Sequence, residues 1–121
     1  TKAMVLRPGL GHIWQTLRDT RLKIGLCSNL AAPYGPPLRA LLPDAPDAEV
    51  LSYNEGHIKP EPEIYHRVIK QLGVPANRIL FVGDTYRADI EGPQEAGMQA
   101  MEIAQFETIF EEMRRLPRYS L

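Results

Sequence analysis

The sequence has little cysteine and no long apolar run. Cys27 is the single cysteine among 121 residues, so no disulfide can form within the chain, which favours a reducing, cytoplasmic setting. No apolar run approaches the roughly 20 residues that a membrane-spanning helix needs, and no charged and then apolar signal segment opens the chain. We therefore expect no membrane partner.

An excess of charge of one sign is also lacking. The net charge is −1 with 24% charged residues, which gives no reason to expect nucleic acid or an anionic membrane as a partner. The length predicts one domain, spanning residues 1–121, with a core of its own. The first residue is Thr1 rather than methionine, so the chain could begin partway through a longer protein.

What the chain does contain is an alternation of short apolar segments and amphipathic patterns. Buried strands are predicted over residues 22–28, 48–53, 78–84 and 98–104. Helices are predicted over residues 10–21, 62–73 and 86–97. Pro62 and Gly73 bound the second helix, and Gly92-Pro93 should bend or restart the third. In the proline-rich stretch 32–48 only the middle can hold a short helix. This alternation predicts parallel β-α-β units in a layered α/β fold.

The C-terminal part carries one more helical pattern. An apolar stripe falls on a single helical face and consists of Phe106, Ile109, Phe110, Met113 and Leu116. Such a stripe ordinarily packs on its own sheet. The alternative is a surface that binds a partner.

Polar residues follow the predicted strands where ligands bind in parallel sheets. The side chains concerned are Ser28, Asn29, Lys59, Asp84 and Asp89. The serine hydroxyl, backbone N–H groups and the lysine ammonium suit phosphoryl oxygens, and the two carboxylates suit Mg²⁺. We expect all of them at one edge of the sheet.

Each of these residues also has a purely structural interpretation. A serine and an asparagine after a strand commonly cap a helix or form a turn, and Lys59 before a proline is ordinarily solvated. Asp84 or Thr85 could cap the next helix, and Asp89 could be an acid favoured by the helix dipole. Residues five apart on an ideal helix do not share a face, so paired carboxylates require the loop to fold back.

Three motifs in this order resemble the haloacid dehalogenase-like hydrolases. They are "GLCSN", "GHIKPEPEIYHRVIKQLGV" and "RILFVGDTYRADIEGPQEAGM", which look like the second, third and fourth motifs of the phosphatase branch with an early helical cap. The resemblance covers roughly residues 7 to 104. It implies a three-layer, Rossmann-like core with a mainly parallel sheet.

The resemblance also implies roles for the strand-end residues. Ser28, with Asn29 beside it, would bind the transferring phosphoryl group, and Lys59 would balance charge on that group and on the nucleophile. Asp84 would be the better metal ligand and Asp89 the second. Ser28 and Lys59 would thus be the catalytic residues, and Mg²⁺ the cofactor.

The family's nucleophile does not occur in this sequence. It would be the first aspartate of an Asp-x-Asp-x-Thr or Val element after an N-terminal strand, but the only acid before Ser28 is Asp19, inside a predicted helix. The first strand, the nucleophile and the cap are therefore expected to be missing. Mg²⁺ affinity should be weak, and no aspartyl-phosphate can form on this chain alone.

The missing strand is the central one of the family's sheet. Its loss would leave two strand edges unpaired, which is costly. The two flanking strands could pair directly, residues 2–6 could fill the gap, or another molecule could supply a strand by self-association. We expect direct closure or filling.

Two functions from different classes follow. In the first, a longer parent protein is a Mg²⁺-dependent hydrolase of a phosphorylated small molecule, and this chain carries the phosphate- and metal-binding half without turnover. In the second, the chain is a naturally shortened, non-catalytic domain that binds a phosphorylated ligand or a protein. A phosphoacceptor signalling domain would need an acidic cluster early in the chain, which is absent.

Overall fold

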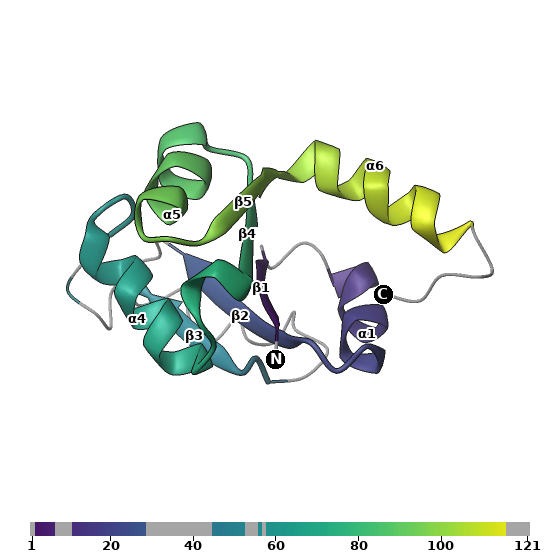
Figure 1. Cartoon of the computed structure of the whole chain (residues 1–121), viewed down its shortest axis with the longest axis horizontal. Coiled ribbons are helices and arrows are strands. Elements are labelled where there is room, and N and C mark those ends of the chain that lie inside the picture. The colour runs from purple at the N-terminus through teal and green to yellow at the C-terminus, as the bar shows by residue number, and fades with distance from the viewer. Residues whose placement is uncertain (1, 7–10, 29–44, 53–55, 57, 116–121) are drawn as a thin grey trace.

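The fold is an α/β arrangement around one sheet (Figure 1). The structure is a computed structural model, and it describes residues 2–6, 11–28, 45–52, 56 and 58–115. The strands are β1 Ala3–Leu6, β2 Lys23–Ser28, β3 Ala48–Leu51, β4 Ile79–Gly83 and β5 Gln99–Glu102. The helices are α1 Gly11–Asp19, α4 Pro62–Leu72, the 3-10 helix η3 Ala76–Arg78, the π-helix η4 Tyr86–Glu91, α5 Gly92–Glu95 and α6 Ile103–Arg114. None of the helices in the described residues is long and apolar enough to span a membrane.

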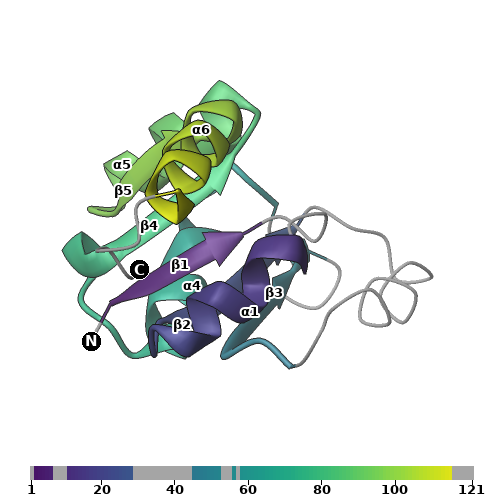
Figure 2. The same ribbon diagram turned by 90° about the vertical axis from the view of Figure 1, so that its right-hand side faces the viewer.

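The five strands form one parallel sheet in the order β3-β2-β1-β4-β5. The prediction of a layered, mainly parallel α/β fold is therefore confirmed. β1 occupies the centre and pairs with β2 on one side and β4 on the other (Figure 2). Residues 2–6 thus fill the gap, as one of the three sequence-based alternatives proposed. Because β1 pairs both inner edges, self-association would have to use the outer strands β3 or β5.

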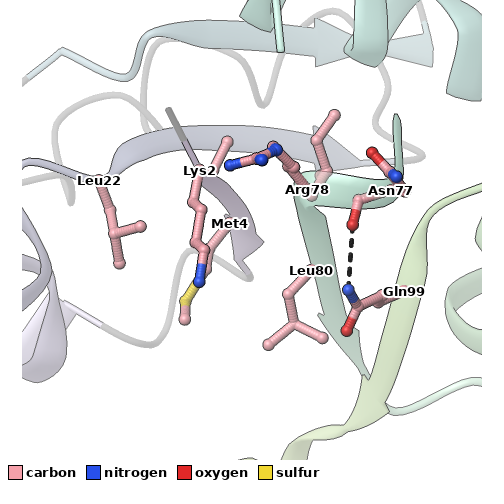
Figure 3. Close-up of a pocket in the computed structure, with 9 residues that line it drawn as sticks. Lys2, Met4, Leu22, Asn77, Arg78, Leu80 and Gln99 are labelled. Atoms are coloured by element: carbon pink, nitrogen blue, oxygen red, sulfur yellow. Dashed lines mark hydrogen bonds between the residues drawn. The ribbon is translucent and has the colours of Figure 1, made fainter. Parts of the chain in front are cut away.

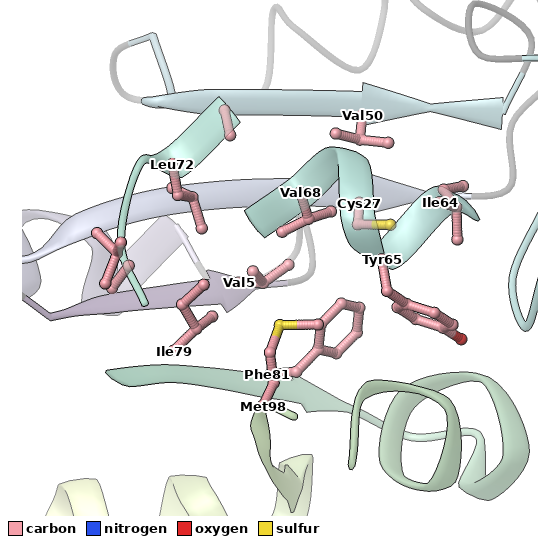
Figure 4. Packing of buried hydrophobic residues seen from close by; sticks show 13 residues of the cluster. Val5, Cys27, Val50, Ile64, Tyr65, Val68, Leu72, Ile79, Phe81 and Met98 are labelled. Atoms are coloured by element: carbon pink, nitrogen blue, oxygen red, sulfur yellow. The ribbon is translucent and has the colours of Figure 1, made fainter. Parts of the chain in front are cut away.

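Successive strand residues point to opposite faces of the sheet, and each face has its own core. We call the side that carries Val5, Ile79 and Phe81 the α4 face, because these residues pack with Ile64, Tyr65 and Val68 of α4 (Figure 4). We call the opposite side the α1 face, where strand residues pack with Trp14 and Leu17 of α1 and with Phe106 and Phe110 of α6. α4 and α5 lie on one side of the sheet, and α1 and α6 on the other (Figure 1).

The α1 face is open near the amino ends of β1 and β4. Met4, Leu22 and Leu80 are only partly buried there, whereas Leu6 and Val82, further along the same strands, are buried. A hollow of about 460 Å³ remains (Figure 3). Its lining consists of Lys2, Ala3, Met4, Leu22, Asn77, Arg78, Ile79, Leu80 and Gln99.

The predicted strands and helices are present, with small shifts at their ends. α4 begins at Pro62 and ends at a left-handed Gly73, whose N–H donates to the carbonyl of Ile69, as the bounding residues indicated. The third helix is interrupted as expected, because η4 ends at Glu91 and α5 begins at Gly92. The helix predicted in the middle of residues 32–48 falls mostly outside the described residues.

The last strand and the last helix differ from the prediction at their boundary. The strand ends at Glu102 rather than at residue 104, because the Glu102 carboxylate accepts the N–H groups of Ala104 and Gln105 and starts α6. Phe106 and Phe110 are buried on the α1 face, as a docked stripe requires. Ile109 is 36% exposed, which corrects its assignment to that stripe. The side chain of Met113, and Leu116, lie outside the described residues.

Candidate functional site

The predicted site residues lie at the carboxyl edge of the parallel sheet. Ser28 is the last residue of β2, and Asp84 directly follows β4, with β1 between the two strands. Ser28 is partly buried, and Asn29 lies outside the described residues. The structure brings Lys59 to the same edge, because its ammonium contacts Asp89, whose carboxylate contacts the backbone of Asp84.

The centre of the site is a buried ion pair. The Lys59 Nζ atom lies 2.6 Å from Asp89 Oδ1, and the two side chains are 13% and 5% exposed. Asp89 is also the one buried charged residue within the described part of the chain. A buried charge is tolerated only when it is paired and hydrogen-bonded, and removal of one partner is strongly destabilising. The interpretation of Lys59 as an ordinary solvated lysine is therefore wrong.

An aromatic ring supports the lysine. The Lys59 ammonium lies 5.6 Å from the centre of the Phe81 ring, within the range of a cation–π interaction. Phe81 is a buried residue of β4 on the α4 face. The ammonium is therefore held between a carboxylate and the negative face of a ring.

The second carboxylate oxygen of Asp89 binds the turn that follows β4. Asp89 Oδ2 accepts the N–H groups of Asp84 and Thr85, each at 3.1 Å. The loop thus folds back so that the Asp89 carboxylate contacts the backbone of residue 84, five positions earlier. Thr85 is the N-terminal boundary residue of η4 but makes no side-chain cap. Asp89 lies in the first turn of η4, where a carboxylate is favoured by the helix dipole. The structural interpretation of Asp89 is therefore correct, but it does not include the ion pair with Lys59.

Gly83 is required for this arrangement. A Cβ atom at position 83 would overlap the Asp89 carboxyl group. Only a residue without a side chain lets the carboxylate approach the end of β4 so closely. The position of Asp84 after a strand could be recognised in the sequence, whereas the need for a glycine before it depends on this contact.

Tyr65, a buried residue of the helix predicted over residues 62–73, also contacts this region. Its side chain extends from α4 over Phe81, with the hydroxyl directed towards η4 and α5 (Figure 4). The hydroxyl donates a hydrogen bond to the backbone carbonyl of Ala88. Burial raises the pKa of the Tyr65 hydroxyl above its ordinary value, with a further contribution from Cys27 and Asp89, so it remains a donor.

Asp84 is placed differently from Asp89. It is exposed, its Oδ1 atom accepts a hydrogen bond from the Thr85 hydroxyl at 3.3 Å, and it borders a hollow of about 240 Å³ beside β5. Among the described residues no group of three or more His, Cys, Asp or Glu could hold a metal ion. Asp84 can offer a carboxylate to a cation, whereas both oxygens of Asp89 already accept protein donors. The described residues therefore do not form a metal centre of three or more such ligands.

The end of the central strand carries no acid. β1 ends at Leu6, and the sequence continues with Arg7, Pro8 and Gly9, which lie outside the described residues. The three residues that directly follow β1 in the sequence therefore include no carboxylate.

Comparison with known proteins agrees with the motifs. A family model described as haloacid dehalogenase-like hydrolase matches residues 2–97. Glyceraldehyde 3-phosphate phosphatase from Pyrococcus abyssi is 30% identical over 105 residues, which are 84% of this chain and 44% of that protein. Phospholysine phosphohistidine inorganic pyrophosphate phosphatase from Rattus norvegicus is 33% identical over 45 residues, 37% of this chain and 17% of that protein. The chain thus spans less than half the length of these curated relatives.

Solved structures share the fold. A HAD phosphatase from Thermococcus onnurineus is 33% identical with a TM-score of 0.64, over 71% of this chain and 40% of that one. A protein from Corynebacterium glutamicum is 16% identical with a TM-score of 0.72, over 92% of this chain and 90% of that one. The second likeness concerns the fold alone, and it shows this fold in a chain of similar extent.

Proposed function

Because the chain belongs to the haloacid dehalogenase-like hydrolase family, we propose that the carboxyl edge of its sheet binds a phosphorylated small molecule. The longer parent protein would be a Mg²⁺-dependent hydrolase of phosphate monoesters. The observation that carries this proposal is the ammonium of Lys59, which is held by Asp89 at the edge where Ser28 and Asp84 also lie.

Each residue has a role set by its chemistry. The Ser28 hydroxyl and the backbone and amide groups at Asn29 donate hydrogen bonds to phosphoryl oxygens. Lys59 contributes a positive charge that is already oriented, so little side-chain entropy is lost when an anion binds. Asp89 fixes the lysine in place through a hydrogen-bonded ion pair.

Mg²⁺ would be held by Asp84, with Asp89 as a second ligand. When bound, the ion would supply positive charge to the phosphoryl oxygens. Asp89 would have to give up a protein donor in order to ligate it, so we propose that affinity for Mg²⁺ is weak in this chain. The hydrolytic step through an aspartyl-phosphate would belong to the longer parent, because no aspartate directly follows β1 in the sequence.

Phosphate binding tests the proposal directly. Titration calorimetry with inorganic phosphate should show binding to the wild-type chain and at least roughly tenfold weaker binding to Lys59→Gln, because a charged donor is lost. Lys70→Gln, which removes an exposed lysine of α4, should bind phosphate like the wild type. If Lys59→Gln unfolds, the double variant Lys59→Gln with Asp89→Asn restores a neutral pair. Equal phosphate affinity in the Lys59 and Lys70 variants would contradict the proposal.

Turnover provides a second test. The chain incubated with p-nitrophenyl phosphate and Mg²⁺ should release no nitrophenolate above background, because it has no nucleophile at the strand end. Activity that is present in the wild type and lost in Asp84→Asn would show that another residue supplies the nucleophile.

A second function is favoured by one observation. β1 occupies the central position of the sheet, so β2 and β4 are both paired on their inner edges by a strand that no aspartate directly follows. This favours a non-catalytic domain that binds a phosphorylated ligand or a protein. An in-frame Asp-x-Asp-x-Thr element upstream of Thr1 in the gene would support the hydrolase, and a start codon adjoining Thr1 would support the binding domain.

A further inference from the structure

The π-helical register of η4 leaves the Ala88 carbonyl without the N–H that would continue it. In this π-helix the N–H of Gly92 donates to the carbonyl of Arg87, five residues earlier. Continuing the same register would place the N–H of residue 93 opposite the carbonyl of Ala88. Residue 93 is proline, which has no N–H. The Ala88 carbonyl must therefore find its donor outside the helix.

The hydroxyl of Tyr65 is that donor. It reaches the Ala88 carbonyl from α4, and the tyrosine is fully buried. A Cβ atom at position 92 would overlap the tyrosine hydroxyl and ring, so a glycine there leaves the room that the side chain needs. The three residues thus act together: Pro93 lacks the N–H, the Tyr65 hydroxyl replaces it, and Gly92 leaves room for the tyrosine. Tyr65 lies on α4, whereas Gly92 and Pro93 lie on α5.

The same contacts form a closed chain through the site. The Tyr65 ring meets the Phe81 ring edge to face at 5.9 Å, and the Phe81 ring lies beneath the Lys59 ammonium. The ammonium contacts Asp89, which directly follows the Ala88 carbonyl that Tyr65 holds. Both members of the ion pair are therefore supported by the same tyrosine, one through a ring and the other through the backbone.

We propose that Tyr65 is a positioning residue, which replaces the missing N–H of Pro93 and so holds the η4 turn where Asp89 meets Lys59 and the turn after β4. This inference deepens the proposed function, and it depends on that function for the role of Tyr65 in phosphate binding. The geometric part can be tested without any ligand.

Amide hydrogen exchange followed by NMR gives that test on the whole chain. The N–H groups of Asp84 and Thr85 donate to Asp89, so their protection reports where that carboxylate lies. In Tyr65→Phe the ring remains but the donor is lost, and exchange at these two amides should be about tenfold faster. Amides of the central strands should keep most of their protection. Tyr86→Phe, the same change at an exposed tyrosine of η4, is the matched control and should leave exchange unchanged.

A rescue variant separates positioning from a general loss of stability. Pro93→Ala supplies an N–H at the position where the tyrosine hydroxyl acts, so adding it to Tyr65→Phe should return exchange at Asp84 and Thr85 to within about threefold of the wild type. Strictly additive effects of the two changes would overturn the proposal. Unchanged exchange in Tyr65→Phe, or equal acceleration in the central strands, would overturn it as well.

Phosphate titration on the same variants keeps this inference distinct from the proposed function. If both are correct, Tyr65→Phe weakens phosphate binding severalfold and Pro93→Ala restores it. A different result would separate the two proposals. If amide exchange at Asp84 and Thr85 is faster in Tyr65→Phe, but neither Tyr65→Phe nor Lys59→Gln changes phosphate binding, then Tyr65 positions the ion pair and the proposal of a phosphate site is wrong.

Discussion

Ile79 and Leu80 are neighbours on β4, yet their side chains have very different surroundings. Ile79 points to the α4 face and is fully buried, whereas Leu80 points to the α1 face, is partly buried and borders the open hollow. The same contrast holds for Val5 and Met4 on β1. Along β1 and β4 the α4 face is therefore covered near the amino ends of the strands, whereas the α1 face is well covered only towards their carboxyl ends.

The ion pair of the candidate site belongs to the well-covered face. Lys59 lies over Phe81, and Asp89 lies against Gly83, two residues further along the same strand and on the same face. A fixed geometry at a binding site requires supporting residues that are locked by packing. The difference between the faces therefore indicates where the chain fixes the positions of its polar groups. Three experiments with substituted chains can test it.

The largest effect should come from truncating the neighbours on β4. Ile79→Ala removes buried methyl and methylene groups from the α4 face and should lower the free energy of unfolding by about 2 to 5 kcal/mol. Leu80→Ala should cost about 1 kcal/mol, because its side chain is partly exposed already. Urea unfolding of both variants gives the comparison. Equal losses would mean that the two faces are equally well packed.

A smaller effect is expected from glycines on the α4 face. In Gly83→Ala the new methyl group overlaps the Asp89 carboxyl group, which must move away from Lys59, so we expect a loss of about 1 to 3 kcal/mol. Gly25→Ala is the matched change on β2, where the nearest atom to a Cβ would be Val5 Cγ2 at 3.3 Å. It should cost less than about 1 kcal/mol. Unfolding free energies measured by urea would contradict this if Gly25→Ala proved the more damaging.

The smallest effect concerns the α1 side and depends on pH. Burial alone would raise the pKa of Asp47, but hydrogen bonds from the Arg18 guanidinium and the Ile24 N–H outweigh it and lower that pKa below 3.8. The resulting stabilisation is present above the ordinary pKa of an unfolded aspartate and is lost as the pH falls through the lower folded value. Between about pH 5 and pH 2.5 the wild type should lose more stability than Asp47→Asn, by less than about 1 kcal/mol because the pair is partly exposed. An identical pH dependence in the two proteins, followed by urea unfolding, would rule out this contribution.

Much of the fold follows from the sequence because its signals are local. Apolar runs bounded by turn residues mark β2 and β4, and Pro62 and Gly73 mark both ends of α4. Filling of the sheet by residues 2–6 could be named only as one of three alternatives, because strand pairing is decided by distant partners. The start of α6 was missed because a carboxylate cap at Glu102 competes with an apolar pattern that continues beyond it.

The sequence indicated which residues belong to the candidate site, but not how they contact one another. Lys59, Asp84 and Asp89 could be selected by their position after strands, and the structure brings them to one edge. The ion pair itself depends on the π-helix η4 and on the loop before α4, which brings Lys59 to Asp89. The spacing of residues along the chain predicts neither feature. Tyr65 gives a helical core pattern in the sequence, so its bond to Ala88 could not be recognised from that pattern.

The central position of β1 has a consequence for how the chain assembles. Ala3 pairs with Lys23, a near neighbour in the sequence, and also with Ile79, so the middle of the sheet joins segments that lie far apart in the chain. Such non-local pairing slows folding, because a long loop must close before the contacts form. During synthesis β1 and β2 would emerge from the ribosome well before β4, with one edge of β1 unprotected. We expect this interval, rather than the finished sheet, to be when the protein is most prone to aggregation.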